Sequence, residues 1–307
     1  MAFASYLNPN ENSWIPVALR SVGGTRRLRL DEKIDLTFDK KLALRFYADS
    51  RPHVFQTARL QKGAIIVCNG VELVEEGLGI GVPVCRYQDG TRFSLSADTF
   101  VHDSDENPTI VKIYDMNGMA SKRFRELLIR RGTPLAHLLK ILEIGYRGLS
   151  KFKTEAAVTL DILSRLGMRN EYLLSPSKGR IAVTYRICGR VLELKATLDD
   201  LSSDRAQSII FANEQGGTVF NEYKDSTGII LRDEEIGPWQ ALQVQWASLR
   251  SRALGVEFTL RRPSRWSIVR GREVVRNRIS WSGLDLFCGE MPEALEYSVE
   301  ISGDPTN

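Results

Sequence analysis

Residues 63–74 read GAIIVCNGVELV, two apolar runs separated by Asn69-Gly70. This arrangement is typical of a two-residue hairpin turn, because both central positions of that turn require a positive φ. A second example follows at residues 83–97, PVCRYQDGTRFSLSA, where Asp89-Gly90 lies between apolar stretches. The sequence therefore predicts consecutive antiparallel strands joined by tight turns.

The same alternation of apolar and polar residues extends in both directions along the chain. Turn residues recur at short intervals, which is typical of meandering sheets in a sandwich or barrel. We therefore predict a mainly β protein, an antiparallel β-sandwich or supersandwich. Its further strands are expected within residues 28–38, 41–49, 53–60, 109–116, 180–198 (turning at Gly189), 207–223 (turning near Gly216-Gly217), 228–235, 255–262, 266–277, 284–289 and 296–302.

The apolar period changes in the middle of the chain. Residues 133–148, TPLAHLLKILEIGYRG, space their leucines as one helical face, and Thr133 and Pro134 are typical of a helix start. Residues 121–132, with Ser121 as N-cap, and residues 153–168 show similar patterns. We expect an N-terminal β region at 1–118, a three-helix segment at 119–170 and a C-terminal β region at 171–307, with the two β regions forming one compact unit.

The composition is that of an ordinary globular protein, with 307 residues, 43% hydrophobic and 26% charged. No apolar run approaches the ~20 residues of a membrane-spanning helix. The N-terminus has no secretory pattern, and the four cysteines have no CxxC spacing. We therefore expect free thiols in strands and a cytoplasmic protein.

Positive charge is concentrated in two blocks. Residues 121–153 contain nine Lys or Arg and two Glu, and residues 250–278 contain nine Arg and two Glu, although the whole chain carries only +4. Such blocks can dock onto an anionic surface or partner. Alternatively, they form a solvated face that acidic neighbours neutralise.

The stretch EEGLGIGVP, residues 75–83, has glycines at every second position. A dinucleotide-binding fingerprint would need a helix next, but Pro83 and a predicted hairpin follow, which excludes a Rossmann site. Two interpretations remain: a strand bend or bulge, and the floor of a site that presents Glu75 or Glu76.

Four further residues are candidates for binding or catalysis. Asn213 and Glu214 follow an apolar strand, where a carboxylate and an amide can bind hydroxyls or act as a general base, although a turn uses the same residues. Trp239 and Trp281 lie in EIGPW and SWSG, and indole faces can stack on sugars, although isolated tryptophans also pack in cores. We take Glu76 and Glu214 as catalytic candidates.

Arg270 and Arg272 flank Gly271 between apolar stretches. We interpret this segment as a hairpin turn with arginines facing solvent, where two guanidiniums could also bind a carboxylate or phosphate. The candidate substrate-binding residues are Asn213, Trp239, Arg270, Arg272 and Trp281.

Several established chemistries lack their motifs. No GxSxG, HExxH, Walker loop or EF-hand loop occurs. The three histidines, His53, His102 and His137, are scattered along the chain. We expect no metal and no cofactor.

Five phrases resemble those of an uncharacterised, largely archaeal protein family: EGLGIGVP (76–83), NEQGG (213–217), EIGPW (235–239), GRE (271–273) and SWSGL (280–284). That resemblance implies no established activity. The β-rich chain also resembles the galactose-mutarotase-like supersandwich, whose members bind sugars and whose mutarotases use a Glu base with His partners. The second resemblance implies a sugar ligand.

Three functions follow as hypotheses. The first is a carbohydrate-binding or carbohydrate-modifying protein whose ligand is a small or polymeric sugar, in one version an anionic sugar whose charge the arginines neutralise. The second is a non-enzymatic interaction protein that docks an anionic surface or partner through the basic helices. The third is an assembly subunit that associates through its sheet edges.

Overall fold

The computed structural model describes residues 25–53, 56–74, 77–102, 108–122, 171–198, 200–202, 206–275, 279–292 and 294–303. Within these ranges the chain forms strands that all pair antiparallel, as the sequence predicts. One short 3-10 helix, η2 (Asp233–Ile236), interrupts them. No helix in the described part is long and apolar enough to span a membrane.

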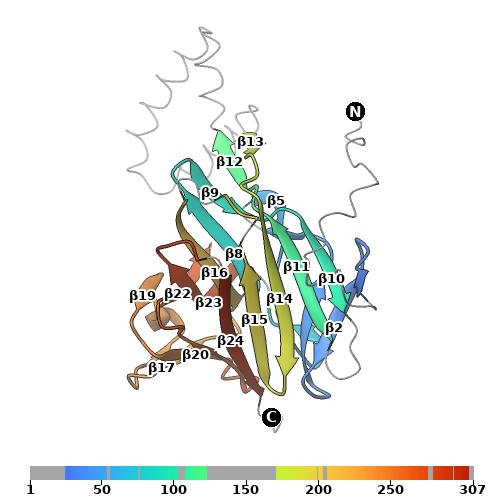
Figure 1. The fold of residues 1–307 in the computed structure, drawn as a ribbon. Helices are drawn as coiled ribbons and strands as arrows, with labels where there is room; N and C mark the ends of the chain where they lie inside the picture. The colour runs from blue at the N-terminus through green and yellow to red at the C-terminus, as the bar shows by residue number, and fades with distance from the viewer. Residues whose placement is uncertain are drawn as a thin grey trace, which may run out of the picture.

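The largest sheet has ten strands. Figure 1 shows its long central strands β14, β15 and β24 running side by side across the molecule. Its order is β1 (Thr25–Arg27), β10 (Ala97–His102), β11 (Thr109–Asp115), β14 (Arg180–Cys188), β15 (Val191–Thr197), β24 (Ala294–Gly303), β21 (Val256–Arg261), β20 (Trp246–Arg250), β17 (Glu222–Asp225) and β18 (Ile230–Arg232).

The second large sheet has six strands. Its order is β19 (Gln240–Leu242), β22 (Ser267–Val275), β23 (Ile279–Cys288), β16 (Ala206–Gly216), β8 (Gly79–Tyr87) and β9 (Gly90–Phe93). Both large sheets therefore combine strands from before residue 118 with strands from after residue 171.

Three smaller sheets complete the described part. The four-stranded sheet carries the Asn69-Gly70 hairpin, in which Cys68 pairs with Val71 and both turn residues have positive φ, 50° and 80°. Its strands are β2 (Lys33–Thr37), β3 (Leu42–Tyr47), β6 (Ile65–Cys68) and β7 (Val71–Glu72), and the two-stranded sheets are β4 (Arg51–His53) with β5 (Gln56–Leu60) and β12 (Met119–Lys122) with β13 (Glu171–Leu174).

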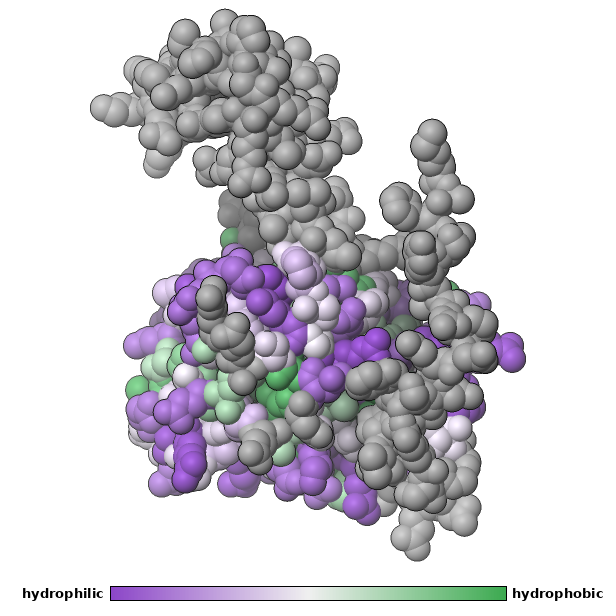
Figure 2. Space-filling model, turned by 45° about the horizontal axis from the view of Figure 1, so that its top comes forward, coloured by the Kyte–Doolittle hydropathy of each residue, from purple (hydrophilic) through white to green (hydrophobic). Residues whose placement is uncertain are grey.

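The core lies between the two large sheets. Tyr185 on β14 donates a hydrogen bond to the carbonyl oxygen of Gly81 on β8 at 2.9 Å, and Tyr297 on β24 donates one to Asn213 on β16 at 3.1 Å. Tyr114 and Tyr185 share a hydrogen bond of 2.8 Å. The Tyr185 and Tyr297 hydroxyls join the two sheets within the interior, where buried polar groups require partners. Figure 2 shows one outer face, where hydrophilic residues surround a smaller apolar area.

The predicted hairpins at Asp89-Gly90 and Gly189 are present. The predicted hairpin at Gly216-Gly217 is wrong, because β16 pairs with β8 and β23 and not with the segment that follows it. The helical segment was expected from residue 119, but residues 119–122 form β12, in which Ser121 pairs with Tyr172. The three-helix prediction therefore gains no support, and its residues 123–170 lie outside the described residues, together with most of the basic block at 121–153.

The four cysteines are free thiols within strands, as expected. Cys85 and Cys288 are buried, and Cys68 and Cys188 are half-buried. Burial raises the pKa of the Cys85 thiol to about 12, so this thiol is unreactive at neutral pH.

Candidate functional site

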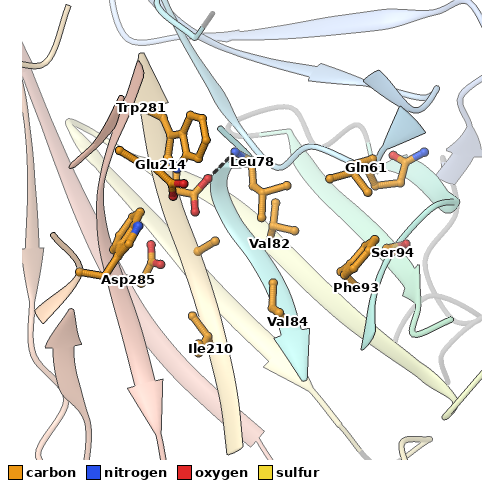
Figure 3. Close-up of a pocket in the computed structure, with 14 residues that line it drawn as sticks. Gln61, Leu78, Val82, Val84, Phe93, Ser94, Ile210, Glu214, Trp281 and Asp285 are labelled. Carbon is orange, nitrogen blue, oxygen red and sulfur yellow. Dashed lines mark hydrogen bonds between the residues drawn. The ribbon is translucent and has the colours of Figure 1, made fainter. Parts of the chain in front are cut away.

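A cavity of about 280 Å³ lies on the six-stranded sheet, on the face that points away from the ten-stranded sheet. Strand alternation assigns the residues to faces: Phe211 and Asn213 point into the sandwich, and Ile210, Ala212 and Glu214 point into the cavity. Figure 3 shows the cavity with its lining. That lining consists of Leu60, Gln61, Leu78, Val82, Val84, Phe93, Ser94, Ile210, Ala212, Glu214, Trp239, Glu273, Trp281 and Asp285.

The glycine-rich stretch forms one wall of this cavity and also bends β8. Gly77, Gly79 and Gly81 have positive φ values of 103°, 79° and 83°, and the pairing of β8 with β16 shifts register between Ala212 and Asn213. A Cβ on Gly81 would lie 2.5 Å from Leu194, so the close approach of β15 also requires glycine there. The predicted bulge is therefore confirmed, and Leu78 of the same stretch lines the cavity.

Glu214 projects from β16 against this wall. Its Oε2 accepts a hydrogen bond of 2.9 Å from the backbone N–H of Leu78 (Figure 3). Burial raises the pKa of Glu214 to about 7, and the charge of Glu273 adds to this, while the Leu78 N–H and the Lys62 ammonium oppose it. The carboxyl can therefore both accept and donate a proton near neutral pH.

Asp285 on β23 is the second buried carboxyl of the cavity. Its Oδ1 accepts a hydrogen bond of 2.9 Å from the backbone N–H of Asn213. Burial and then the charge of Glu214 raise the pKa of Asp285 well above its ordinary value. The two carboxyl side chains are neighbours, since Glu214 Cγ and Asp285 Oδ1 lie 3.0 and 3.2 Å from the position of a Cβ on Gly283.

The Trp239 indole packs directly against two glycines. Gly271 and Gly283 are paired on β22 and β23, and their ideal Cβ positions lie 2.3 and 2.7 Å from ring atoms of Trp239. Any larger residue would displace the ring. Trp281 lines the same cavity from β23 and is 8% exposed.

The structure thus brings Glu214, Trp239 and Trp281 together, as candidates for one site. Glu76 lies outside the described residues. Asn213 lies in the interior with no exposed surface, and its side chain bonds to Gly81, Phe211, Leu284 and Tyr297. Its described contacts join the two sheets and orient Asp285.

Arg270 and Arg272 do not line the cavity. The predicted turn at residues 270–273 is wrong, because this segment is the middle of β22, paired throughout with β23. Gly271 is required there by Trp239 and not by a turn. The two arginines point to the other face, toward the ten-stranded sheet, where the Arg270 guanidinium lies 4.8 Å from the centre of the Tyr223 ring.

The cavity also contains two acidic residues that the sequence analysis did not select, Asp285 and Glu273. Asp285 could have been found from the segment GLDLF, residues 283–287, where a single carboxylate interrupts an apolar strand. Because side chains alternate along a strand, Asp285 lies on the face opposite Leu284 and Leu286. Glu273 was visible only as part of the supposed turn.

Other candidate features lie elsewhere. His102 is on β10, 3.3 Å from Thr25, and the cavity lining within the described ranges contains no histidine. Among the described residues no group of three His, Cys, Asp or Glu is arranged to hold a metal ion. In the second basic block, Arg252 pairs with Asp233 and Arg261 with Glu300, so the proposed basic patch gains no support there.

Comparisons with known proteins give limited similarity. No family model matches the chain, and no curated protein matches it, so the archaeal resemblance gains no support. A galactose mutarotase-like protein from Lactobacillus casei ATCC 334 is similar at 10% identity, covering 89% of this chain and 100% of that chain, with a TM-score of 0.40. The Slr1438 protein from Synechocystis sp. PCC 6803 is similar at 9% identity, covering 91% and 97%, with a TM-score of 0.41.

Proposed function

We propose that the cavity binds a neutral carbohydrate and that Glu214 and Asp285 move protons on its oxygen atoms. One observation carries this proposal: two neighbouring carboxyls with raised pKa values lie beside two indoles in a single cavity. Residues with strongly perturbed pKa values in a cleft are candidates for function, and aromatic faces complement the C–H surfaces of sugars.

The size of the cavity favours a small sugar. Its volume of about 280 Å³ lies near the lower end of the roughly 300–1,000 Å³ typical of small-molecule sites. Apolar residues of β8 and β16 form its floor, with Glu214 and Asp285 on one side and Gln61 and Ser94 on the other (Figure 3). A single sugar ring, with one apolar face and hydroxyls at its edge, matches this distribution.

The charge of the lining favours a neutral ligand. Glu214, Glu273 and Asp285 are acidic, and the lining residues of the described ranges include no Lys or Arg. A uronate or sugar phosphate would meet these carboxyl groups with no Lys or Arg of the described lining to neutralise it, which is unfavourable in a poorly solvated site. We therefore restrict the sugar to a neutral one.

The two carboxyls suit paired acid–base chemistry. In one turnover, ionised Glu214 would remove a proton from a sugar hydroxyl while protonated Asp285 would give its proton to a second oxygen, and the reverse transfers would restore both groups. The ring opening of a cyclic hemiacetal needs these two proton transfers: the C1–O5 bond breaks, the anomeric hydroxyl loses its proton and the ring oxygen gains one.

Calorimetric titration tests the binding. We expect neutral hexoses to bind at millimolar concentration, and uronates and hexose phosphates to bind more weakly. Trp239→Ala should weaken binding by about tenfold, the loss expected for one aromatic stacking contact. Trp246→Ala, on β20 of the other sheet, is the matched control. Failure of every neutral sugar to bind, or unchanged affinity in Trp239→Ala, would contradict the proposal.

Polarimetry of anomer interconversion tests the chemistry. Glu214→Gln keeps the shape of the side chain but cannot take up the proton. In this variant the rate of anomer interconversion should fall by about 10²–10⁴-fold, while the affinity for the sugar should change little. If the unmodified protein binds a sugar but does not accelerate anomer interconversion, the binding proposal stands and the proposed catalysis is rejected.

A further inference from the structure

A group of unpaired polar atoms lies inside the sandwich, on the face of β22 and β23 opposite the cavity. In the described part of the chain, six buried side-chain nitrogen or oxygen atoms lack a hydrogen-bond partner, and five of them belong to Arg270, Arg272, Ser280 and Ser282. Arg272 pairs with Ser282 across the two strands, and Ser280 is the next residue of β23 on that face. The unpaired atoms are therefore gathered at one place.

The charge at this place is poorly compensated. The Arg272 side chain is only 10% exposed, and the carboxylate with which it forms an ion pair, on Glu234, is 88% exposed and 3.7 Å away, beyond hydrogen-bonding distance. Nε and Nη1 of Arg272 and Nε of Arg270 have no acceptor. Buried charges in proteins are normally paired, because removing an ion from water without a partner costs several kcal/mol.

The chemistry of the unpaired atoms specifies the missing partner. Guanidinium nitrogens only donate, and serine hydroxyls can donate, so each of these atoms can give a hydrogen bond to an acceptor. Nε and Nη1 lie on opposite edges of the guanidinium, so an anion on one edge of Arg272 would take one of these two donors together with the serine hydroxyls on the same face. Water would satisfy single donors but would add no negative charge beside the guanidinium.

We propose that Arg272, Ser280 and Ser282, with Arg270 beside them, bind a small oxyanion of the phosphate or sulfate class between the two sheets. The backbone N–H of Arg272 bonds to the Gly237 carbonyl at 2.8 Å, which holds the end of η2 against this site. The site faces away from the carboxyl-lined cavity, and it does not depend on the carbohydrate proposal.

Calorimetry with inorganic phosphate and sulfate tests the site, using the full chain dialysed free of both and a constant ionic strength set with chloride. We expect saturable binding of one anion per chain. Arg272→Met should weaken it by about 10- to 100-fold, the loss of one or two charge-assisted hydrogen bonds. Arg261→Met, an exposed arginine on β21, should bind as the unmodified protein does.

Three results would overturn the site: no binding of either anion, equal binding by Arg272→Met, or an equal loss in Arg261→Met. If Arg272→Met does not fold, Ser282→Ala decides, because it removes only a hydroxyl that has no protein partner. Its phosphate affinity should fall, and unchanged affinity would reject the site. Glu214→Gln should bind phosphate normally, so failure of the sugar proposal leaves this result interpretable.

Discussion

The raised pKa of Glu214 predicts a stability that falls as pH rises through the weakly acidic range. The folded carboxyl has a pKa of about 7 against an ordinary value of 4.5. Between these values the folded protein binds more protons at this site than the unfolded chain, so raising the pH favours unfolding. Below pH 4.5 both states are protonated and the penalty is absent.

The size of the effect follows from the same two values. Linkage gives a loss of about 2 kcal/mol from Glu214 between pH 5 and pH 7. Asp285, whose pKa is also raised, acts in the same direction. Carboxyl groups whose pKa values are lowered, such as Asp35 and Asp225, stabilise the fold fully above pH 5 and lose that effect as the pH falls below it. Their contribution therefore changes little between pH 5 and pH 7. The window from pH 5 to pH 7 is therefore dominated by the cavity carboxyls, and Lys112, whose pKa is lowered to about 7, acts in the opposite direction only near its upper end.

Urea denaturation at pH 5, 6 and 7 measures this slope in the unmodified protein and in Glu214→Gln. We expect the unmodified protein to lose stability across the window and the variant to lose about 2 kcal/mol less, because glutamine does not titrate. A stability that rises or stays flat from pH 5 to pH 7, or an identical slope in the variant, would refute the argument that burial dominates at Glu214.

Three further changes test other parts of the structure. Gly271→Ala places a Cβ 2.3 Å from the Trp239 ring and should lower the free energy of unfolding by about 1–3 kcal/mol and weaken sugar binding. Gly289→Ala is the control, because the nearest atom to its Cβ is 4.0 Å away. Equal unfolding midpoints for the two variants would contradict the expectation. Lys112 is fully buried with its pKa lowered to about 7. Between pH 7.5 and 9.5 the unfolded chain binds more protons at this residue than the folded protein, so stability should rise with pH in the unmodified protein and not in Lys112→Met. Parallel curves of stability against pH for the two proteins would argue against a neutral lysine in the fold. Tyr185→Phe removes the bond to Gly81 and should cost about 1–3 kcal/mol in chemical denaturation, and a neutral result would show that the bond between the sheets is dispensable.

Much of the fold could be predicted from local sequence. The hairpins at Asn69-Gly70 and Gly189 followed from residues that tolerate positive φ between apolar runs, because turn geometry depends only on its own few residues. The error at Gly216-Gly217 has the opposite cause. A strand of eleven residues can pair with distant partners, and those partners, β8 and β23, are set by long-range packing that a local pattern does not contain.

The candidate site divides in the same way. The sequence alone selected Glu214, Trp239 and Trp281, because carboxylates and indoles stand out among apolar strands. The tertiary structure decided which face each residue occupies: it placed Arg270 and Arg272 on the face opposite the cavity and added Asp285 and Glu273 to the cavity. The physical reason is the two-residue period of a strand, where one step along the chain turns a side chain to the opposite face. Residue type is written in the sequence, whereas the register of neighbouring strands determines which side chains meet.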